Sequence, residues 1–298
     1  MARGLEEGVK GEFWMCRGCK MGRSSDTKHP RKDLEYRAKE PLELIHTDIA
    51  GPFAPMAIEG KAKYNLVIVD DYSRKSWCIN LIHTAPAVKE WIAIHGNQVG
   101  KKVKTMRPDN GGENIDKACE KWLKEHGTLH QTIPARTTQA NGVSERRNTL
   151  VQDRGRSMLV GAGLGGGFWV EAIAVACYIR NRGPVAGLNK TPDELWSGKV
   201  SSVKHLIDYG SKAYVSLEKK KRHGKMGETK WEGVIVGYPS TSVGYRVWDP
   251  VRGKVYNVAV QFVDGNVEPS WWRKWNGGGA AKEVEGIIFP SLPVDITP

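Results

Sequence analysis

Tyr64–Asp71 is a predicted strand that is apolar enough to be central in a sheet. A shorter strand is predicted before it, at Leu44–Ile49, and the turn dipeptide Gly51-Pro52 ends that strand. A third strand is predicted at Ser76–Ile82, after a tight turn. The sequence therefore predicts three neighbouring strands at the beginning of one sheet.

Helices and strands alternate beyond this point. The predicted elements are, in order, a helix over residues 85–98, a strand at Val103–Met106, a helix opened by Gly111-Gly112, a short strand at Thr128–Ile133, a long helix from near Ala140 to Val160 and an apolar helix at Phe168–Arg182. A glycine-rich break at Gly161–Gly167 is expected between the last two. This order predicts an α/β fold in which helices cover the faces of a mixed sheet.

Short strands separated by turns are predicted in the C-terminal third of the chain. They lie at Ala213–Leu217, Gly233–Gly237, Tyr245–Trp248, Lys254–Val258 and near Gln261–Val263. A capped helical turn precedes them at Thr191–Trp196, with proline in its first helical position. We expect a separate β-barrel or sheet of about 60 residues in this region.

The chain is basic, with 45 Lys and Arg against 33 Asp and Glu and a net charge of +12. Residues 196–275 alone have a net charge of +7, centred on the run Lys219, Lys220, Lys221 and Arg222. A basic surface of this kind favours a polyanionic partner, because phosphate contacts release condensed counterions. A merely soluble basic protein has the same composition, so charge alone leaves both interpretations open.

Membrane and secretory signals are absent from the sequence. No stretch approaches the ~18–20 consecutive apolar residues that a membrane span requires. The first residues, from Met1 to Glu7, lack the apolar run of a secretory signal. We therefore expect a soluble intracellular protein without a membrane partner.

Five cysteines, an odd number, do not indicate a disulfide framework. Cys78, Cys119 and Cys177 lie in apolar strand-like or helical patterns and are expected to be buried thiols. Cys16 and Cys19 differ, because their Cys-x-x-Cys spacing can present two thiolates to one Zn²⁺ ion. No second pair stands nearby, so the zinc site is incomplete and zinc binding stays open.

Three acidic residues stand where their side chains can converge. Asp48 ends the first strand, Asp109 follows the fourth, and Glu145 lies in the first turns of the long helix. Carboxylate oxygens brought together above one edge of a sheet suit Mg²⁺ or Mn²⁺. Two such ions can activate an attacking oxygen and stabilise a leaving one in phosphoryl transfer. Each acid alone is also an ordinary turn or helix-surface residue, so position by itself leaves a structural role open.

Motifs around these acids resemble, in order along the chain, the integrase core of copia-type LTR retrotransposons. They are His46-Thr47-Asp48-Ile49-x-Gly51-Pro52, Val69-Asp70-Asp71-Tyr72-Ser73-Arg74, Asp109-Asn110-Gly111-Gly112-Glu113 and Asn141-Gly142-Val143-Ser144-Glu145-Arg146-Arg147-Asn148. Further matching motifs continue to Gly244–Pro250, in what resembles the SH3-like β module of that family. The resemblance implies an RNase H-like core of the retroviral integrase type, with a mixed sheet flanked by helices, followed by that small module.

The resemblance also implies a reaction and its ligands. Asp48, Asp109 and Glu145 would be the catalytic residues and would hold two Mg²⁺ or Mn²⁺ ions. Water would first trim the 3′ end of the element's DNA, and the freed 3′-hydroxyl would then attack a phosphodiester of target DNA. No small-molecule cofactor is implied.

Residues on and near the catalytic helix are expected to contact DNA. The expected contacts are Asn141, Gly142, Arg146, Arg147, Asn148, Gln152 and Arg156, together with the basic run at Lys219–Arg222. Asn148, Gln152 and Arg156 fall roughly on one face with Glu145, whereas Arg146 and Arg147 are expected at its rim. A solvated helix face is the alternative for the arginines, and a localisation signal is the alternative for the basic run.

On this resemblance the chain has four parts. Residues 1–40 are expected to be the remnant of a zinc-binding module, 41–198 the catalytic core, 207–266 the SH3-like module and 267–298 an irregular tail. The leading hypothesis is an integrase that works in the nucleus, as a homo-oligomer on element ends and target DNA. The alternatives are a catalytically silent nucleic-acid-binding protein from a decayed or domesticated element, and an RNase H-like nuclease that cuts without joining.

Overall fold

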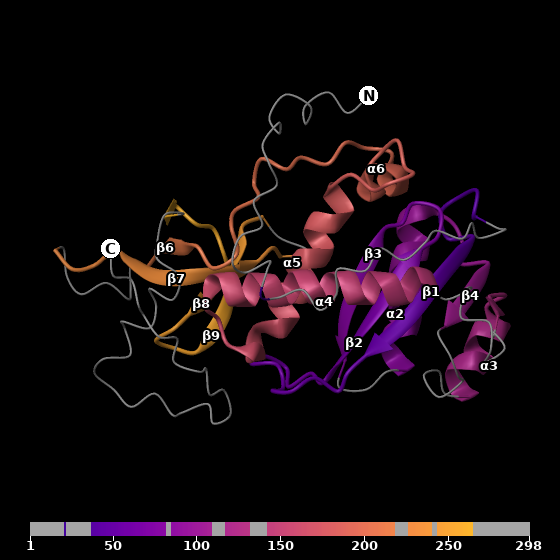
Figure 1. Cartoon of the computed structure of the whole chain (residues 1–298), viewed down its shortest axis with the longest axis horizontal. Coiled ribbons are helices and arrows are strands. Elements are labelled where there is room, and N and C mark those ends of the chain that lie inside the picture. Colours follow the sequence, from indigo (N-terminus) through magenta and orange to yellow (C-terminus); the bar gives the residue numbers. More distant parts are fainter. Residues whose placement is uncertain are drawn as a thin grey trace, which may run out of the picture.

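The computed structural model describes residues 37–81, 85–108, 117–131, 142–217, 226–239 and 243–264, together with Met21. These ranges contain two five-stranded sheets (Figure 1). The first sheet has the order β3-β2-β1-β4-β5. Its strands are β1 at Leu44–Ala50, β2 at Tyr64–Asp70, β3 at Ser76–Leu81, β4 at Thr105–Pro108 and β5 at Leu129–His130. Antiparallel pairs join β1 to β2 and β2 to β3, whereas β4 pairs parallel with β1 and β5 with β4, so the sheet is mixed as predicted.

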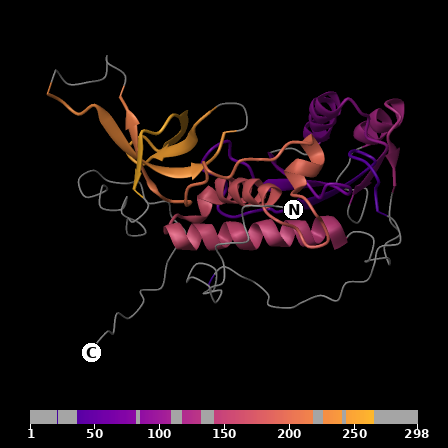
Figure 2. The same ribbon diagram turned by 90° about the horizontal axis from the view of Figure 1, so that it is seen from above.

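Helices cover both faces of this sheet, as the two views show (Figures 1 and 2). The helices α2 (Ala85–Val99) and α3 (Lys117–Glu125) lie on one face, and α4 (Gly142–Ala162) and α5 (Trp169–Arg182) lie on the other. Side chains alternate along β2, so Leu66 and Ile68 join the first core and Val67 and Val69 the second. Burial on both faces explains why this strand is apolar almost throughout.

Helix α4 extends beyond its predicted end. The sequence predicts a break at Gly161, but the helix continues through Gly161 to Ala162. Ala162 packs with Leu164 and Phe168 in a core cluster that also contains Val234 of the second sheet. Packing of this kind offsets the ~1 kcal/mol that a glycine costs inside a helix.

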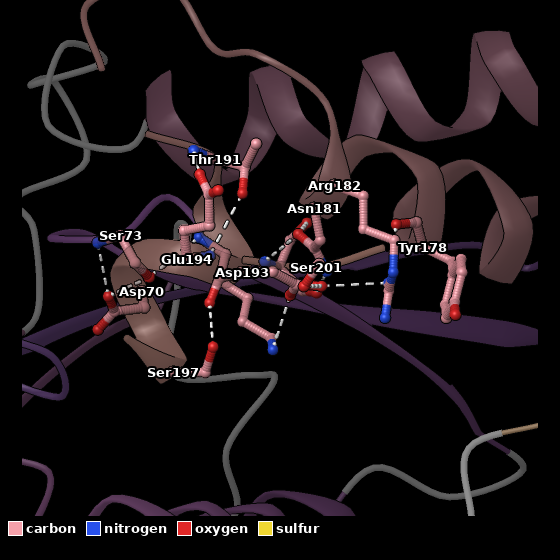
Figure 3. Close-up of polar contacts among 12 residues, drawn as sticks. Asp70, Ser73, Tyr178, Asn181, Arg182, Thr191, Asp193, Glu194, Ser197 and Ser201 are labelled. Carbon is pink, nitrogen blue, oxygen red and sulfur yellow. Dashed lines mark hydrogen bonds and ion pairs between the residues drawn. The ribbon is translucent and has the colours of Figure 1, made fainter. Parts of the chain in front are cut away.

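Helix α6 (Pro192–Ser197) begins at the predicted cap. Thr191 Oγ1 accepts a hydrogen bond from the Glu194 backbone N–H at 3.3 Å, and Glu194 Oε2 accepts one from the Thr191 N–H at 2.7 Å. The buried Asp193 carboxylate lies 2.8 Å from Lys75 Nζ and 3.2 Å from Arg182 Nη1. Figure 3 shows Asp193 and Arg182. The cap therefore fixes α6 locally, and the two ion pairs fix it to α5 and to the residue just before β3.

The second sheet is antiparallel throughout, in the order β10-β6-β7-β8-β9. Its strands are β6 at Lys212–Ser216, β7 at Lys230–Gly237, β8 at Tyr245–Asp249, β9 at Lys254–Val258 and β10 at Phe262–Asp264. Arg246 Nη2 of β8 lies 3.2 Å from a carboxylate oxygen of Glu59 and 3.3 Å from one of Glu171. Trp248 of β8 also makes an edge-on contact with Phe168, with ring centroids 4.8 Å apart. The ion pairs and this contact attach the second sheet to α5 and to the segments around Glu59 and Phe168.

The three cysteines that the structure describes, Cys78, Cys119 and Cys177, are free thiols. Cys119 and Cys177 are buried as predicted, whereas Cys78 is only half-buried because it lies on β3, the edge strand of the first sheet. Cys16 and Cys19 lie outside the described residues. No helix within the described ranges has both the length and the apolar character needed to cross a membrane.

Candidate active site

Asp48 lies near the end of β1 and faces helix α4. Side chains alternate along a strand, so Asp48 points to the same side of the sheet as His46. Asn148 of α4 donates a hydrogen bond from Nδ2 to Asp48 Oδ2 at 2.8 Å, and this contact identifies that side as the one that α4 covers. The Asp48 side chain is half-buried, so it is reachable from solvent.

Glu145, Asn148 and Gln152 follow one another along α4 at helical spacing. Gln152 Nε2 donates to Asn148 Oδ1 at 2.9 Å, which leaves the Asn148 amide nitrogen directed at Asp48. Asn148 is only 5% exposed, so its orientation is fixed by packing as well as by hydrogen bonds. Glu145 lies one turn before Asn148 and shares its face, because residues three apart are neighbours on a helix surface.

A cluster of buried polar side chains adjoins Asp48 on the same strand. His46 Nε2 is hydrogen-bonded to Asp71 Oδ1 at 3.1 Å, and Arg74 Nη1 lies 2.9 Å from the same oxygen. Burial works to raise the pKa of Asp71, but the His46 hydrogen bond and the Arg74 charge together leave that pKa below its ordinary value. Burial lowers the pKa of His46, although Asp71 opposes this effect. The cluster therefore contains a carboxylate held in its charged form.

Asp70 fixes the turn that carries this cluster. Its carboxylate accepts hydrogen bonds from the Leu42 N–H at 2.8 Å, from the Ser73 N–H at 2.8 Å and from the Ser73 hydroxyl at 2.6 Å (Figure 3 draws the Asp70–Ser73 contacts). Burial raises the pKa of Asp70 even so. Asp70 and Asp71 follow one another at the end of an apolar strand, and this pattern could have indicated the cluster from the sequence. A carboxylate buried at such a position requires hydrogen-bond or charge partners.

Arg147 is not at the rim of the helix face, and that prediction is wrong. Arg147 is 8% exposed, and its Nη2 donates to the backbone carbonyl of Arg74 at 3.0 Å. The helix packs on the first sheet through Val143 and Val151, and Arg147 lies between them on this packed side. Its guanidinium is therefore directed into the protein rather than towards a ligand in solvent.

Arg146 and Arg156 are exposed on α4. Arg156 Nη1 pairs with Asp153 Oδ1 at 3.0 Å, one turn back on the same helix. An exposed ion pair of this kind contributes little stability, so Arg156 can exchange Asp153 for another anion at small cost. Gly142 is the first residue of α4. Asn141, Asp109 and Lys219–Arg222 lie outside the described residues.

The donor set of this site suits a hard divalent cation. Asp48 and Glu145 offer carboxylate oxygens, the ligands that Mg²⁺ and Mn²⁺ prefer. Within the described ranges, no group of three or more His, Cys, Asp or Glu side chains could hold a metal ion. The third expected acid, Asp109, directly follows Pro108, and Pro108 pairs with Thr47 in the parallel register of β1 and β4.

Two protein families match this chain. Residues 38–138 match the integrase core domain, and residues 211–269 match the retroviral polymerase SH3-like domain. The chain carries an integrase core followed by a retroviral SH3-like domain. The mixed sheet with flanking helices is thus an RNase H-like integrase core, and the antiparallel sheet is the SH3-like domain, as predicted. Integrase core domains belong to the polynucleotidyl transferase superfamily.

Transposon proteins are similar to this integrase core and its SH3-like domain. The retrovirus-related Pol polyprotein from transposon TNT 1-94 of Nicotiana tabacum is 35% identical over 219 residues, which are 72% of this chain and 16% of that protein. The corresponding polyprotein from transposon RE1 of Arabidopsis thaliana is 27% identical over 78% of this chain and 16% of its own length. The chain therefore spans about one sixth of the curated relatives that it matches.

A chain of a solved viral structure is similar to this chain at low sequence identity. The simian T-cell lymphotropic virus intasome, in complex with the PP2A regulatory subunit B56 gamma, contains a chain that is 13% identical with a TM-score of 0.46. The alignment covers 85% of this chain and 88% of that chain.

Proposed function

We propose that this chain is the integrase of a copia-type retrotransposon and catalyses metal-dependent 3′-end processing and DNA strand transfer. The contact between Asn148 and Asp48 carries the proposal, because it brings the predicted catalytic helix to the predicted catalytic strand. Glu145 lies one turn from that contact. The 35% identity to a transposon Pol polyprotein, over most of this chain, supports the same assignment.

The proposed metal ligands are Asp48, Asp109 and Glu145, which would hold two Mg²⁺ or Mn²⁺ ions. When bound, the two ions supply an activated attacking oxygen and stabilise the leaving oxygen of an in-line displacement at phosphorus. Asn148 orients the Asp48 carboxylate by donating to Oδ2, and Gln152 orients Asn148 in turn.

The proposed partners are the DNA ends of the element and target DNA, bound by a homo-oligomer acting in the nucleus. Exposed Arg146 and Arg156 are suited to phosphate contacts beside the carboxylates, because guanidinium groups pair with phosphate oxygens in bidentate geometry. Asn148 and Gln152 support Asp48 in this proposal rather than contacting DNA, since their amides bond within the site. The basic run Lys219–Arg222 is a further proposed phosphate contact.

A strand-transfer assay tests the proposal. The purified chain is incubated with Mg²⁺ or Mn²⁺, target DNA and a labelled duplex that ends in the terminus of the candidate element. We expect joined products from the wild-type chain and from Glu125→Gln, a control that removes an exposed carboxylate of α3, but none from Glu145→Gln. DNA binding without product in both metals would overturn the proposal in favour of a silent DNA-binding protein, and nicking without joining would favour a nuclease.

A further inference from the structure

A chain of four polar side chains links the two elements that carry the proposed metal ligands. On β1, His46 lies two residues before Asp48 and is 1% exposed. It contacts Asp71, which is also 1% exposed, and Asp71 is paired with Arg74 in the turn between β2 and β3. The first part of this chain therefore runs from the proposed catalytic strand to that turn, through two buried side chains to the partly exposed Arg74.

The second part runs from the same turn to the catalytic helix. Arg74 has a φ of +60°, a left-handed conformation that is uncommon for residues other than glycine. In this conformation its carbonyl accepts the 3.0 Å hydrogen bond from Arg147, and its guanidinium still reaches Asp71. Arg147 lies two residues after Glu145 on α4. Such a backbone conformation is strained and persists where the surroundings enforce it.

We propose that His46, Asp71, Arg74 and Arg147 are positioning residues that set the separation of Asp48 from Glu145. The inference rests on the function proposed above and assigns these residues no contact with substrate. The chain of contacts begins two residues from Asp48 and ends two residues from Glu145 in the sequence. Its first link joins β1 to the turn after β2, its second lies within that turn, and its third joins the turn to α4. Loss of a link would leave β1 and α4 well packed but free to shift by fractions of an ångström, which is enough to weaken metal binding.

A second buried carboxylate in the same protein provides a matched control. Asp193 is 4% exposed and lies against two basic side chains, Lys75 and Arg182, as Asp71 lies against His46 and Arg74 (Figure 3 shows Asp193 and Arg182). The Asp193 ion pairs join α6 to α5 and to Lys75, the residue just before β3, and neither β1 nor α4 takes part in them. Asp71→Asn and Asp193→Asn therefore remove the same charge from similar surroundings, and only the first alters the proposed connection.

The test measures Mn²⁺ affinity by titration calorimetry of the full chain, together with kcat and KM in the strand-transfer assay. We expect Asp71→Asn to weaken Mn²⁺ binding by about tenfold and to lower kcat while KM for DNA is retained, since groups that support metal ligands typically have effects of 10–100-fold. Asp193→Asn is expected to keep the wild-type Mn²⁺ affinity even where it lowers the melting temperature.

A second pair of variants covers the case in which Asp71→Asn does not fold. Arg147→Met removes the donor to the Arg74 carbonyl, and Arg147→Lys keeps a donor on a side chain of similar length. We expect Arg147→Met to lose Mn²⁺ affinity and Arg147→Lys to recover part of it. Equal affinities in these two variants, or an unchanged affinity in Asp71→Asn, would overturn this inference alone. A wild-type chain that binds no Mn²⁺ through Asp48 would instead overturn the proposed function.

Discussion

The side-chain amide of Asn148 donates a 2.8 Å hydrogen bond to the Asp48 carboxylate and so joins helix α4 to strand β1 across 100 positions of sequence. Both residues belong to motifs that the sequence had marked, but their direct contact was not predicted. The contact gives the proposed active site a neutral hydrogen-bond donor beside a charged acceptor. Bonds of this type are stronger than those between two neutral groups.

A double-mutant cycle measures this contact. We expect Asp48→Ala and Asn148→Ala to show a coupling of about 1.5–3 kcal/mol in the free energy of unfolding, because hydrogen bonds to charged groups contribute in this range. Urea denaturation in metal-free buffer gives the four values of the cycle. Additive effects of the two substitutions would show that the bond does not stabilise the folded protein.

The stability of the folded protein should depend on the ion pair between Arg246 and Glu171. Glu171 is almost fully buried, with a side-chain exposure of 1%, whereas Arg246 is 30% exposed. Arg246→Met should lower the free energy of unfolding by about 2–3 kcal/mol, somewhat less than for a fully buried pair, because it leaves a buried carboxylate without its cation. Adding Glu171→Gln should recover most of the loss in a denaturation experiment. If Glu171→Gln failed to compensate, Arg246 would be acting through Glu59 instead.

The Glu171 carboxyl group should also make the stability of the protein fall as the pH rises. Burial raises the pKa of Glu171 above its ordinary value of 4.5, although the Arg246 charge opposes the rise. Stability from this group is therefore complete below about pH 4.5 and is lost as the pH rises through the folded-state pKa. Glu171→Gln cannot ionise, so its stability relative to wild type should increase between pH 4.5 and 7. A difference independent of pH, measured by thermal denaturation, would contradict the shift.

Alanine substitutions at two glycines, Gly187 and Gly210, distinguish the cost of backbone strain from the cost of a steric clash. Gly210 has a φ of +93°, and a Cβ there would lie 2.4 Å from Ala162 Cβ, whereas Gly187 has a φ of +81° with open space around it. Gly187→Ala should cost only the backbone strain, about 1–2 kcal/mol. Gly210→Ala should lower the free energy of unfolding by a further 1–3 kcal/mol, because the end of α4 must move. If chemical denaturation gave the two variants equal losses in the free energy of unfolding, the segment before β6 would be able to move and relieve the clash at no cost.

Local patterns in the sequence were sufficient for most of the elements. The apolar run of β2 indicated both a strand and a central position, since Leu66 and Val67 are buried on opposite faces. The cap of α6 could be predicted because Thr191 and Glu194 interact within four residues. The end of α4 at Ala162 could not, because it depends on a contact with Val234 of a distant strand.

The same distinction holds within the proposed active site. Helical spacing placed Glu145, Asn148 and Gln152 on one face, because that relation depends on α4 alone. It misplaced Arg147, because spacing does not say which flank of a helix is covered by its neighbours. The partner of Arg147 is the carbonyl of Arg74, 73 positions away and in a backbone conformation that residue type does not favour. Such a contact is decided by tertiary packing, not by local sequence.

The basic run Lys219–Arg222 should determine how DNA binding responds to salt. Each cation that meets a phosphate of duplex DNA adds about −0.9 to the slope of log Kobs against log salt concentration. Replacing all four residues by alanine should therefore make the slope shallower by about 3–4, as measured by fluorescence anisotropy with a labelled duplex between 50 and 200 mM salt. Lys121→Ala combined with Lys124→Ala removes cations from exposed positions of α3 and should leave the slope nearly unchanged. A wild-type slope in the fourfold variant would show that the run does not contact phosphate and would favour its alternative role as a localisation signal.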